Sequence, residues 1–389
     1  PPRPPMNVEL AVDPLLFAGA ALLVAGVVVA GVAQRFRAPA LLLFLGLGML
    51  IGDDGFGWFS FDDPERAQSI AVVALVVILF EGGLGSSVRD IRAVAAPAGL
   101  LATVGVVVTA GIVAGALLLL TDVDSTTCWL VGAVVASTDA AAVFAVLRTT
   151  KVRRPLVRLL ETESGANDPV AVLLTVGVLV AWESDPSGLD WVVFGVRQLA
   201  GGLIVGLVIG VLAGVVVRSE RLGSATLYPV FALAVAGLAY GAGTAIGASG
   251  FLAVYVAGVA VGDASRRHQA QIVRFHRGLA DVAQITLFLM LGLLVFPSEL
   301  LDVSATGLVA AGALVFVARP LAVGVVLPWF GFGPREVAFA AWAGLRGAVP
   351  IVLATFPLTA GYPDGSLVFD VVFFVVLVSA TVQGLSLGG

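Results

Sequence analysis

Long apolar stretches alternate with short polar loops along the whole chain, and this pattern predicts membrane-spanning helices. A span needs about 20 residues, so the second and ninth of these stretches are short and are expected to be tilted or partly buried in protein. The predicted segments are 14–33, 38–52, 67–85, 93–120, 127–148, 156–182, 191–217, 226–244, 249–263, 274–296, 304–328, 335–358 and 365–385. We therefore expect an all-α polytopic membrane protein with about 13 transmembrane helices.

Composition supports this class. The chain has 389 residues, 59% of them apolar and 12% charged, with a mean hydropathy of +1.06; soluble proteins carry about 25% charged residues. The single cysteine, Cys128, excludes a disulfide framework within the chain and a cysteine-only metal site. Residues 1–5 precede Met6 and are interpreted as a cloning or processing remnant, because they lack the apolar core of a signal peptide. The sequence has no basic patch of the kind that binds nucleic acid. The apolar segments predict that the chain is surrounded by membrane lipids.

Loop charges predict the orientation of the spans. The loops after the odd spans hold 16 of the 21 basic residues, whereas those after the even spans are acidic; Arg66 and Arg197 are the exceptions. By the positive-inside rule, residues 1–13 form an extracellular tail and the C-terminus is cytoplasmic. The expected location is the cell (inner) membrane.

The spans can be divided into six, one and six, which gives two inverted six-helix repeats. The fifth span of each half is interrupted by polar or helix-breaking residues: Ser137-Thr138-Asp139 in span 5, and Gly344-Leu345-Arg346-Gly347 followed by Pro350 in span 12. Discontinuous helices in corresponding positions are typical of a transporter's midplane binding site. Unwound backbone there can offer carbonyl and amide groups to ions.

Residues 161–172 place polar groups inside an otherwise apolar span. Glu163 and Asn167 share one helical face, and Ser164 and Asp168 share the neighbouring face. A charge at the bilayer centre costs about 3 kcal/mol on insertion scales. A buried ion pair that fixes helix packing would explain Glu163 alone, but it does not explain Asp168 between Asn167 and a proline.

Four acids and two arginines lie at membrane depth, which leaves two negative charges to be neutralised: Glu81, Asp139, Glu163, Asp168, Arg319 and Arg346. Competition between protons and bound cations for such groups is what cation/proton exchange requires. Asp139 and Asp168 are the predicted binding pair, because carboxylates are hard oxygen ligands for small cations. The Ser164 hydroxyl and the Thr138 carbonyl could add ligands. Asn167 cannot ionise and is interpreted as an orienting group, which favours exchange of one proton for one monovalent cation without net charge movement.

The other charged groups at this depth have structural interpretations. Glu163 is expected to pair with Arg346 or Arg319, and Arg319 is interpreted as a structural counter-charge. Glu81, near the inner end of span 3, could be a ligand, a funnel charge or a surface acid.

Three polar groups lie at the start of the tenth span. Asp281 is expected to form an interfacial ion pair with Arg277, one turn away. His268 and His276 are interpreted as solvated loop residues, with a cytoplasmic pH sensor as the alternative.

These motifs resemble the monovalent cation/proton antiporter family, on its electroneutral, NhaP-like sodium/proton side. The matching pieces are Ser137-Thr138-Asp139, the stretch from Glu163 to Asp168, Arg319, and the stretch from Gly344 to Ala348. Residues 275–297 look more like the bacterial potassium/proton branch of the family. That branch often carries a C-terminal regulatory domain, which is absent from this sequence and could have been removed.

The resemblance implies a homodimer in which a core domain of spans 4–6 and 11–13 moves against an interface domain of spans 1–3 and 8–10. The corresponding ranges are 14–120 for spans 1–4, 127–182 for spans 5 and 6, 191–217 for the linking span 7, 226–296 for spans 8–10 and 304–385 for spans 11–13. It also implies cation ligation by Asp139, Asp168, Ser164 and the Thr138 carbonyl, with Glu81 as a contributor and Glu163 with Arg346 as a structural pair. No cofactor is implied besides the transported Na⁺ or K⁺ and H⁺.

Three other functions fit the sequence less well than an alternating-access antiporter. A cation-coupled symporter of a small organic solute would need a larger polar cavity. An intramembrane protease could use Ser249 in Gly247-Ala248-Ser249-Gly250, but no histidine lies within a predicted span to activate it, apart from His276 at the very start of the tenth. Asp139 and Asp168 could mimic an aspartyl protease pair, although the surrounding serine, asparagine and arginines favour ion ligation. A channel would need a continuous polar stripe, which no predicted helix has.

Overall fold

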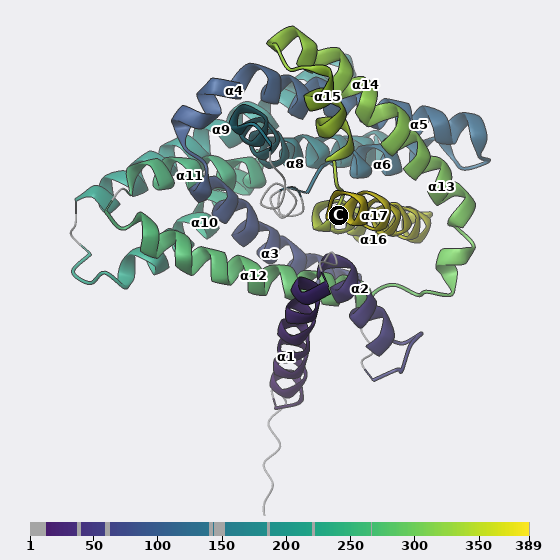
Figure 1. Ribbon diagram of the computed structural model, residues 1–389, viewed down its shortest axis with the longest axis horizontal. Coiled ribbons are helices and arrows are strands. Elements are labelled where there is room, and N and C mark those ends of the chain that lie inside the picture. Colours follow the sequence, from purple (N-terminus) through teal and green to yellow (C-terminus); the bar gives the residue numbers. More distant parts are fainter. Residues whose placement is uncertain are drawn as a thin grey trace, which may run out of the picture.

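The computed structural model of the chain describes residues 13–36, 40–58, 63–139, 143, 152–184, 187–219, 222–265 and 267–388. Over these ranges the fold is built from helices and contains no β-strand (Figure 1). Most of the predicted N-terminal tail and the second half of the predicted fifth span lie outside the described residues.

The first half of the chain forms α1 to α8, with a π-helical turn at Leu101–Gly105 between α4 and α5. The helices of this half are α1 (Asp13–Phe36), α2 (Ala40–Ile51), α3 (Pro64–Gly85), α4 (Val88–Leu100), α5 (Val106–Leu120), α6 (Ser125–Val135) and α8 (Arg154–Glu183). The second half begins with the long helix α9 and has its own π-helical turn, Ala313–Ala318, between α13 and α14. Its helices are α9 (Gly188–Arg218), α10 (Leu227–Ala245), α11 (Gly250–Ala264), α12 (Gln269–Leu293), α13 (Ser304–Gly312), α14 (Arg319–Val326), α15 (Pro334–Trp342), α16 (Ala348–Thr359) and α17 (Gly365–Gly388).

The all-helical class predicted from the hydropathy pattern is confirmed. Helix ends in the described residues lie within about five positions of the predicted segment ends, apart from the interruptions described below. Seven helical segments are long and apolar enough to cross a membrane, and shorter apolar helices accompany them. The number of segments that cross the membrane remains a prediction.

Contacts between helices divide the described chain into two groups. The flanking group consists of α1–α3 and α9–α12, where α11 packs on α3 and α9, and α12 packs on α2 and α3. The broken-helix group consists of α4–α6, α8 and α13–α17, where α5 packs on α6, α4 on α8, and α16 on α17. Figure 1 shows α16 and α17 near the middle of the view and α10–α12 together at its lower left. The two groups meet mainly where α3 packs on α16 and where α11 packs on α8.

A glycine seam holds α9 against α11 in the flanking group. Gly202, Gly206, Gly210 and Gly214 recur every four residues and therefore share one face of α9. A side-chain carbon at any of them would lie 2.5–2.8 Å from an atom of α11 or of the serine that precedes it. Small residues allow such backbone contact and are typical of helix interfaces within membranes.

The interruptions recur at equivalent places in the two halves. A π-helical turn divides α4 from α5 in the predicted fourth span and α13 from α14 in the predicted eleventh. The next span of each half is broken: α6 ends at Val135 before a non-helical segment, and residues 343–347 separate α15 from α16. The predicted discontinuity of helices 5 and 12 is therefore confirmed, although the continuation of helix 5 lies outside the described residues.

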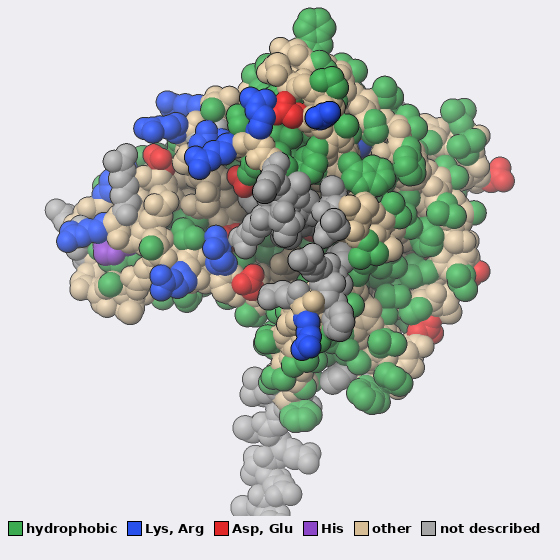
Figure 2. Space-filling model, viewed as in Figure 1, with side chains coloured by type: hydrophobic (Ala, Val, Ile, Leu, Met, Phe, Trp, Pro, Cys, Tyr) green, Lys and Arg blue, Asp and Glu red, His purple; other side chains and the backbone are tan. Residues whose placement is uncertain are grey.

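Charged side chains are unevenly distributed over the surface. In Figure 2 most of the visible basic side chains gather at the left and top of the molecule, over α4, α10 and the adjoining helix ends. The right edge of the same view shows acidic but no basic side chains. The loop-charge pattern of the sequence thus corresponds to separate regions of the described surface.

Candidate functional site

The first non-helical segment carries Asp139, one of the predicted binding aspartates. Its backbone N–H donates to the carbonyl of Leu345 in the second break, at 2.9 Å. Its carboxylate oxygen Oδ2 accepts from the backbone N–H of Ala348 at 3.3 Å, where α16 begins. The N-terminus of a helix carries partial positive charge and favours a carboxylate there. Gly347 makes this approach possible, since a Cβ atom at that position would overlap the Asp139 carboxylate.

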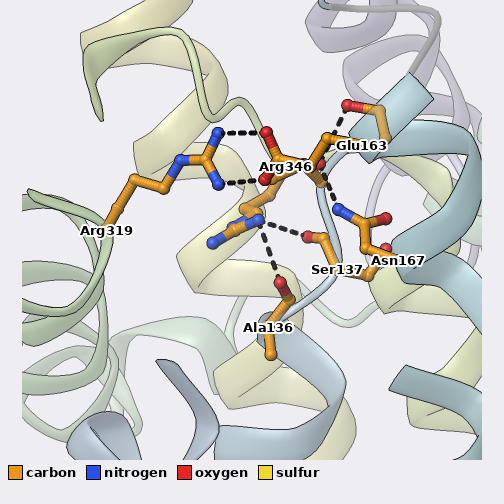
Figure 3. A network of polar contacts seen from close by, with 8 residues as sticks. Ala136, Ser137, Glu163, Asn167, Arg319 and Arg346 are labelled. Atoms are coloured by element: carbon orange, nitrogen blue, oxygen red, sulfur yellow. Dashed lines mark hydrogen bonds and ion pairs between the residues drawn. The ribbon is translucent and has the colours of Figure 1, made fainter. Parts of the chain in front are cut away.

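Arg346 makes the reciprocal contact from the second break to the first. Its Nη1 donates to the carbonyls of Ala136 (3.2 Å) and Ser137 (2.6 Å), just past the C-terminal end of α6 (Figure 3). A cation is favourable at a helix C-terminus because the last carbonyls have no helical donors. Each break therefore supplies a charged residue to the other: Asp139 lies at the N-terminus of α16, and Arg346 lies at the C-terminus of α6.

Asp168, the second predicted aspartate, faces the same non-helical segment from α8. It is 2% exposed, and its Oδ1 accepts from the hydroxyl of Ser137 at 2.5 Å. Pro169 follows within the helix, where it lacks the N–H that would complete the helical bond to Gly165. Asp139 and Asp168 are close enough to interact electrostatically, and the Ser137 bond ties Asp168 to the segment that carries Asp139.

Hydroxyl and amide groups surround this pair of acids. The hydroxyls of Thr138 and Ser164 share a hydrogen bond of 2.9 Å, and Nδ2 of Asn167 donates to the Thr138 hydroxyl at 2.5 Å. All three residues are at most 1% exposed. The Asn167 oxygen Oδ1 is buried and has no hydrogen-bond partner among the described residues. The predicted Thr138, Ser164, Asn167 and Asp168 thus lie in one connected cluster with the first break.

Glu163 pairs with Arg319, which is one of the two arginines that the sequence offered as its partner. Both guanidinium nitrogens Nη1 and Nη2 of Arg319 donate to the two carboxylate oxygens, the second at 3.0 Å, and both side chains are buried (Figure 3). The pairing of Glu163 with Arg346 implied by the family resemblance is therefore wrong as a direct contact. Arg346 instead donates to the carbonyls at the end of α6.

Two residues of α17 support the second break and were missed by the sequence analysis. The Arg346 N–H donates to the Ser379 hydroxyl at 3.2 Å, and this hydroxyl donates to Oε1 of Gln383 at 2.6 Å. Nε2 of Gln383 donates to the Trp342 carbonyl at 2.9 Å, where α15 ends. Both polar residues are at most 1% exposed, and their spacing of four within an apolar span was the available signal.

The ion pair described for Glu81 is separate from the hydrogen bonds that define this cluster. Its carboxylate forms an ion pair with Arg277 of α12 at 3.6 Å, and its side chain is 23% exposed. The expected pairing of Arg277 with Asp281 is therefore wrong, and Asp281 is exposed. Glu81 remains a predicted contributor to cation binding without a described contact to Asp139 or Asp168.

The interpretation of His276 as a solvated loop residue is wrong. It lies inside α12, is fully buried, and bonds through Nδ1 to the Ile272 carbonyl at 2.9 Å. Its ring packs near Phe80 and Phe275, with centroids 5.3 Å apart in each case. His268 is half-buried and stacks on Tyr228 at 3.9 Å between centroids.

The cluster can hold a small cation or a proton. The two arginines at this depth contact Glu163 and backbone carbonyls, while the described contacts of Asp139 and Asp168 come from backbone N–H and hydroxyl groups. Carboxylate, hydroxyl and carbonyl oxygens are hard ligands that suit alkali and alkaline-earth cations. A buried carboxylate can be neutralised by a cation or by a proton, and the two would compete for the same oxygen atoms.

Comparison with known proteins identifies the family. The sequence profile described as "Sodium/hydrogen exchanger, transmembrane" matches residues 19–389. The chain belongs to the sodium/hydrogen exchanger family. This is a family of monovalent cation/proton antiporters, which are transporters and not enzymes.

Two relatives that are named potassium/proton antiporters are about 40% identical to this chain. The K(+)/H(+) antiporter NhaP of Alkalimonas amylolytica is 43% identical over 361 residues, which cover 92% of this chain and 62% of the relative. The K(+)/H(+) antiporter NhaP2 of Shewanella sp. (strain ANA-3) is 40% identical over 373 residues, covering 95% and 65%. The chain thus spans a little under two thirds of the length of these relatives.

A sodium-linked relative and a solved structure complete the comparison. The Na(+)/H(+) antiporter NhaP of Pseudomonas aeruginosa is 31% identical over 339 residues, which cover 81% of this chain and 78% of the relative. The structure of the sodium proton antiporter MjNhaP1 from Methanocaldococcus jannaschii superimposes with a TM-score of 0.82, at 23% identity, covering 97% of this chain and all of that one. This chain therefore has the fold of that antiporter.

Proposed function

We propose that this chain exchanges a monovalent cation, Na⁺ or K⁺, for H⁺ across a membrane. The observation that carries the proposal is the meeting of Asp139 and Asp168 at two broken helices, among hydroxyl and amide groups. A carboxyl group buried at this depth needs a neutralising partner. A cation and a proton would compete for it, and this competition couples their opposite movements.

We propose the following roles for the site residues. Asp168 and Asp139 bind the cation or the proton, with the Ser164 hydroxyl and the Thr138 carbonyl as further cation ligands. Asn167 orients the Thr138 hydroxyl, as its 2.5 Å hydrogen bond suggests. Four further residues have supporting roles: Glu163 with Arg319 holds α8 to α14, Arg346 holds the end of α6, and Glu81 guides cations toward the site.

The transport step is proposed to be alternating access, in which the broken-helix group moves against the flanking group. The separate packing of the two groups supports this division: the broken-helix group corresponds to the expected core domain, and the flanking group to the expected interface domain together with the linking span 7. We further propose a homodimer in the cell (inner) membrane, with the N-terminus outside and the C-terminus cytoplasmic. The segregation of basic and acidic loop residues supports the orientation.

The transported cation is Na⁺ or K⁺ in this proposal. The relatives with the higher identities are named K(+)/H(+) antiporters, whereas one at 31% is named a Na(+)/H(+) antiporter. We therefore expect K⁺ to be accepted, and proton flux driven in turn by Na⁺, Li⁺ and K⁺ gradients would measure the preference. Because this chain spans 62–65% of those K(+)/H(+) relatives, the assay uses this chain as it stands.

Asp168→Asn tests the role of the central carboxylate. In proteoliposomes with an internal pH-sensitive dye, the variant should lose cation-driven proton movement, because an amide cannot hold a proton and a cation in turn. Asp370→Asn is the matched control: Asp370 is also buried, at 8% exposure, but lies in α17 and makes no described contact with the cluster. It should retain exchange. Exchange by Asp168→Asn at the wild-type rate would refute the proposed role.

Electroneutrality is a separate part of the proposal. Asn167 beside Asp168 leaves one titrating group at this step, which favours one H⁺ for one cation. On a solid-supported membrane, cation jumps should then produce no transport current, although dye measurements on the same vesicles show exchange. A current that scales with turnover would contradict the one-to-one stoichiometry and leave the exchange itself intact.

A further inference from the structure

Tyr255 of α11, in the flanking group, contacts α8 at the cluster. It is 7% exposed, and its ring lies directly over Gly165, between Ser164 and Asp168 in sequence. A side-chain carbon at Gly165 would lie 2.6–2.9 Å from Cε2, Cζ and the hydroxyl oxygen of this ring. The absence of a side chain at Gly165 therefore lets the aromatic ring of one helix group rest on the backbone of the other.

The hydroxyl of Tyr255 is buried and has no hydrogen-bond partner among the described residues. The Ser86 hydroxyl lies nearby and donates to the Gly82 carbonyl at 3.0 Å, and its contact with the Tyr255 hydroxyl does not have the geometry of a hydrogen bond. A buried hydroxyl without a partner is unfavourable, because it has lost its hydrogen bonds to water. The conformation described here thus leaves a polar group at the group boundary unsatisfied.

Two acids of α8 lie on either side of the point that Tyr255 touches. Glu161 precedes Gly165 by four residues and Asp168 follows it by three, so all three are on neighbouring parts of one helical face. Both acids interact electrostatically with the Tyr255 hydroxyl. With a rise of 1.5 Å per residue, Asp168 lies about 4.5 Å further along the helix axis than Gly165. A shift of less than one helical turn would bring the hydroxyl level with the carboxylate.

We propose that Tyr255 is a positioning residue whose hydroxyl, above Gly165 in this conformation, donates a hydrogen bond to the Asp168 carboxylate in the opposite conformation of the transport cycle. This inference rests on the proposed exchange function. A carboxylate has room for a bound cation and a hydroxyl donor together. The hydroxyl therefore gains a partner when α8 slides along α11, and this gain favours the step from the present conformation to the other.

Tyr255→Phe tests the proposal, since it keeps the ring and removes only the hydroxyl. In proteoliposomes we expect kcat for cation-driven proton movement to fall about tenfold, the effect of one hydrogen bond to a charged group. KM for the cation should stay within about twofold, because cation ligands are unchanged. Ser86→Ala should leave both constants at wild-type values, because the Ser86 hydroxyl has no part in the proposed step.

Gly165→Ala supplies an independent test of the sliding contact. The added methyl group would collide with the Tyr255 ring and should lower kcat by at least about tenfold. In a Tyr255→Leu background, where the ring is absent, the same alanine should have little further effect. Such non-additivity is the expected signature of two residues in direct contact.

Each outcome decides between alternatives. Wild-type kcat in Tyr255→Phe overturns the proposal, and so does an equal loss in Ser86→Ala, which would indicate a static bond between the two hydroxyls. A raised KM with unchanged kcat also overturns it, because the hydroxyl would then be a cation ligand. Additive effects of Gly165→Ala and Tyr255→Leu refute the sliding contact. Absence of exchange in the wild-type chain would refute the proposed function itself, so the two failures are distinguishable.

Discussion

Replacement of Glu163 by glutamine should destabilise the protein without changing how tightly it binds its cation. The change removes one charge from a buried, bidentate ion pair and keeps the size of the side chain. Arg319, whose side chain is 7% exposed, is then left charged without a counter-ion. Arg346 is near enough to Arg319 for the two like charges to repel each other once Glu163 is neutral.

The magnitude follows from the burial of both partners. Removal of one member of a buried pair costs about 3–5 kcal/mol, because an uncompensated charge remains in a medium of low polarity. With the entropy of unfolding usual for globular proteins, a chain of 389 residues should unfold about 5 °C lower for a loss of about 4 kcal/mol. The double variant Glu163→Leu/Arg319→Met removes both charges and should recover most of this loss, because apolar replacement of a whole buried pair is often neutral.

Thermal unfolding in detergent, followed by tryptophan fluorescence, measures the stability, and proteoliposome assays measure the KM for the cation. The expected result is a lower midpoint with KM within about twofold of wild type. A wild-type midpoint together with a KM raised tenfold or more would refute the structural role. Glu163 would then act as a cation ligand, and its bond with Arg319 would be incidental.

Two further variants test the breaks. Gly347→Ala should reduce exchange at least about tenfold, because its methyl group would displace the Asp139 carboxylate, whereas Gly324→Ala, at a site with open space, should exchange normally. Asp124→Ala should lower the free energy of unfolding by about 1 kcal/mol, since Asp124 caps α6 through the Thr126 N–H at 2.8 Å. That bond holds the pKa of Asp124 below its ordinary value, so its stabilisation is present above about pH 4 and is lost as pH falls through the lowered pKa. Unfolding midpoints measured down to pH 3 should therefore fall more steeply in wild type than in the variant; parallel curves would contradict the assignment.

The sequence predicted the helices and their interruptions because both depend on local composition. A run of apolar residues predicts a span wherever it occurs, and polar or glycine residues in mid-span predict a break. The segments at Ser137–Asp139 and Gly344–Gly347 are non-helical for this reason. The π-helical turns in α4–α5 and α13–α14 were not predicted, since their residues are as apolar as the helices around them.

Contacts between distant residues were predicted less well. Two intramembrane arginines could equally neutralise Glu163, and only the three-dimensional placement of Arg319, at the start of α14, within reach of the Glu163 carboxylate selects it. His276 was assigned to the arginine-rich loop although it lies just inside the predicted range 274–296, and the helix begins still earlier, at Gln269. Its spacing of four from the buried Ile272 would have indicated the inward face. Tyr255 gave no signal, since an aromatic residue in an apolar span usually serves packing alone.

The reciprocal contacts of the two breaks have a consequence for protein engineering. Asp139 completes the start of α16, and Arg346 completes the end of α6, so each irregular segment satisfies backbone groups of the other. A chimera that takes one of these segments from a distant relative would leave unbonded amides or carbonyls in its neighbour. Segment exchange should therefore succeed only when both are transplanted together, as a single unit assembled from the two halves of the chain.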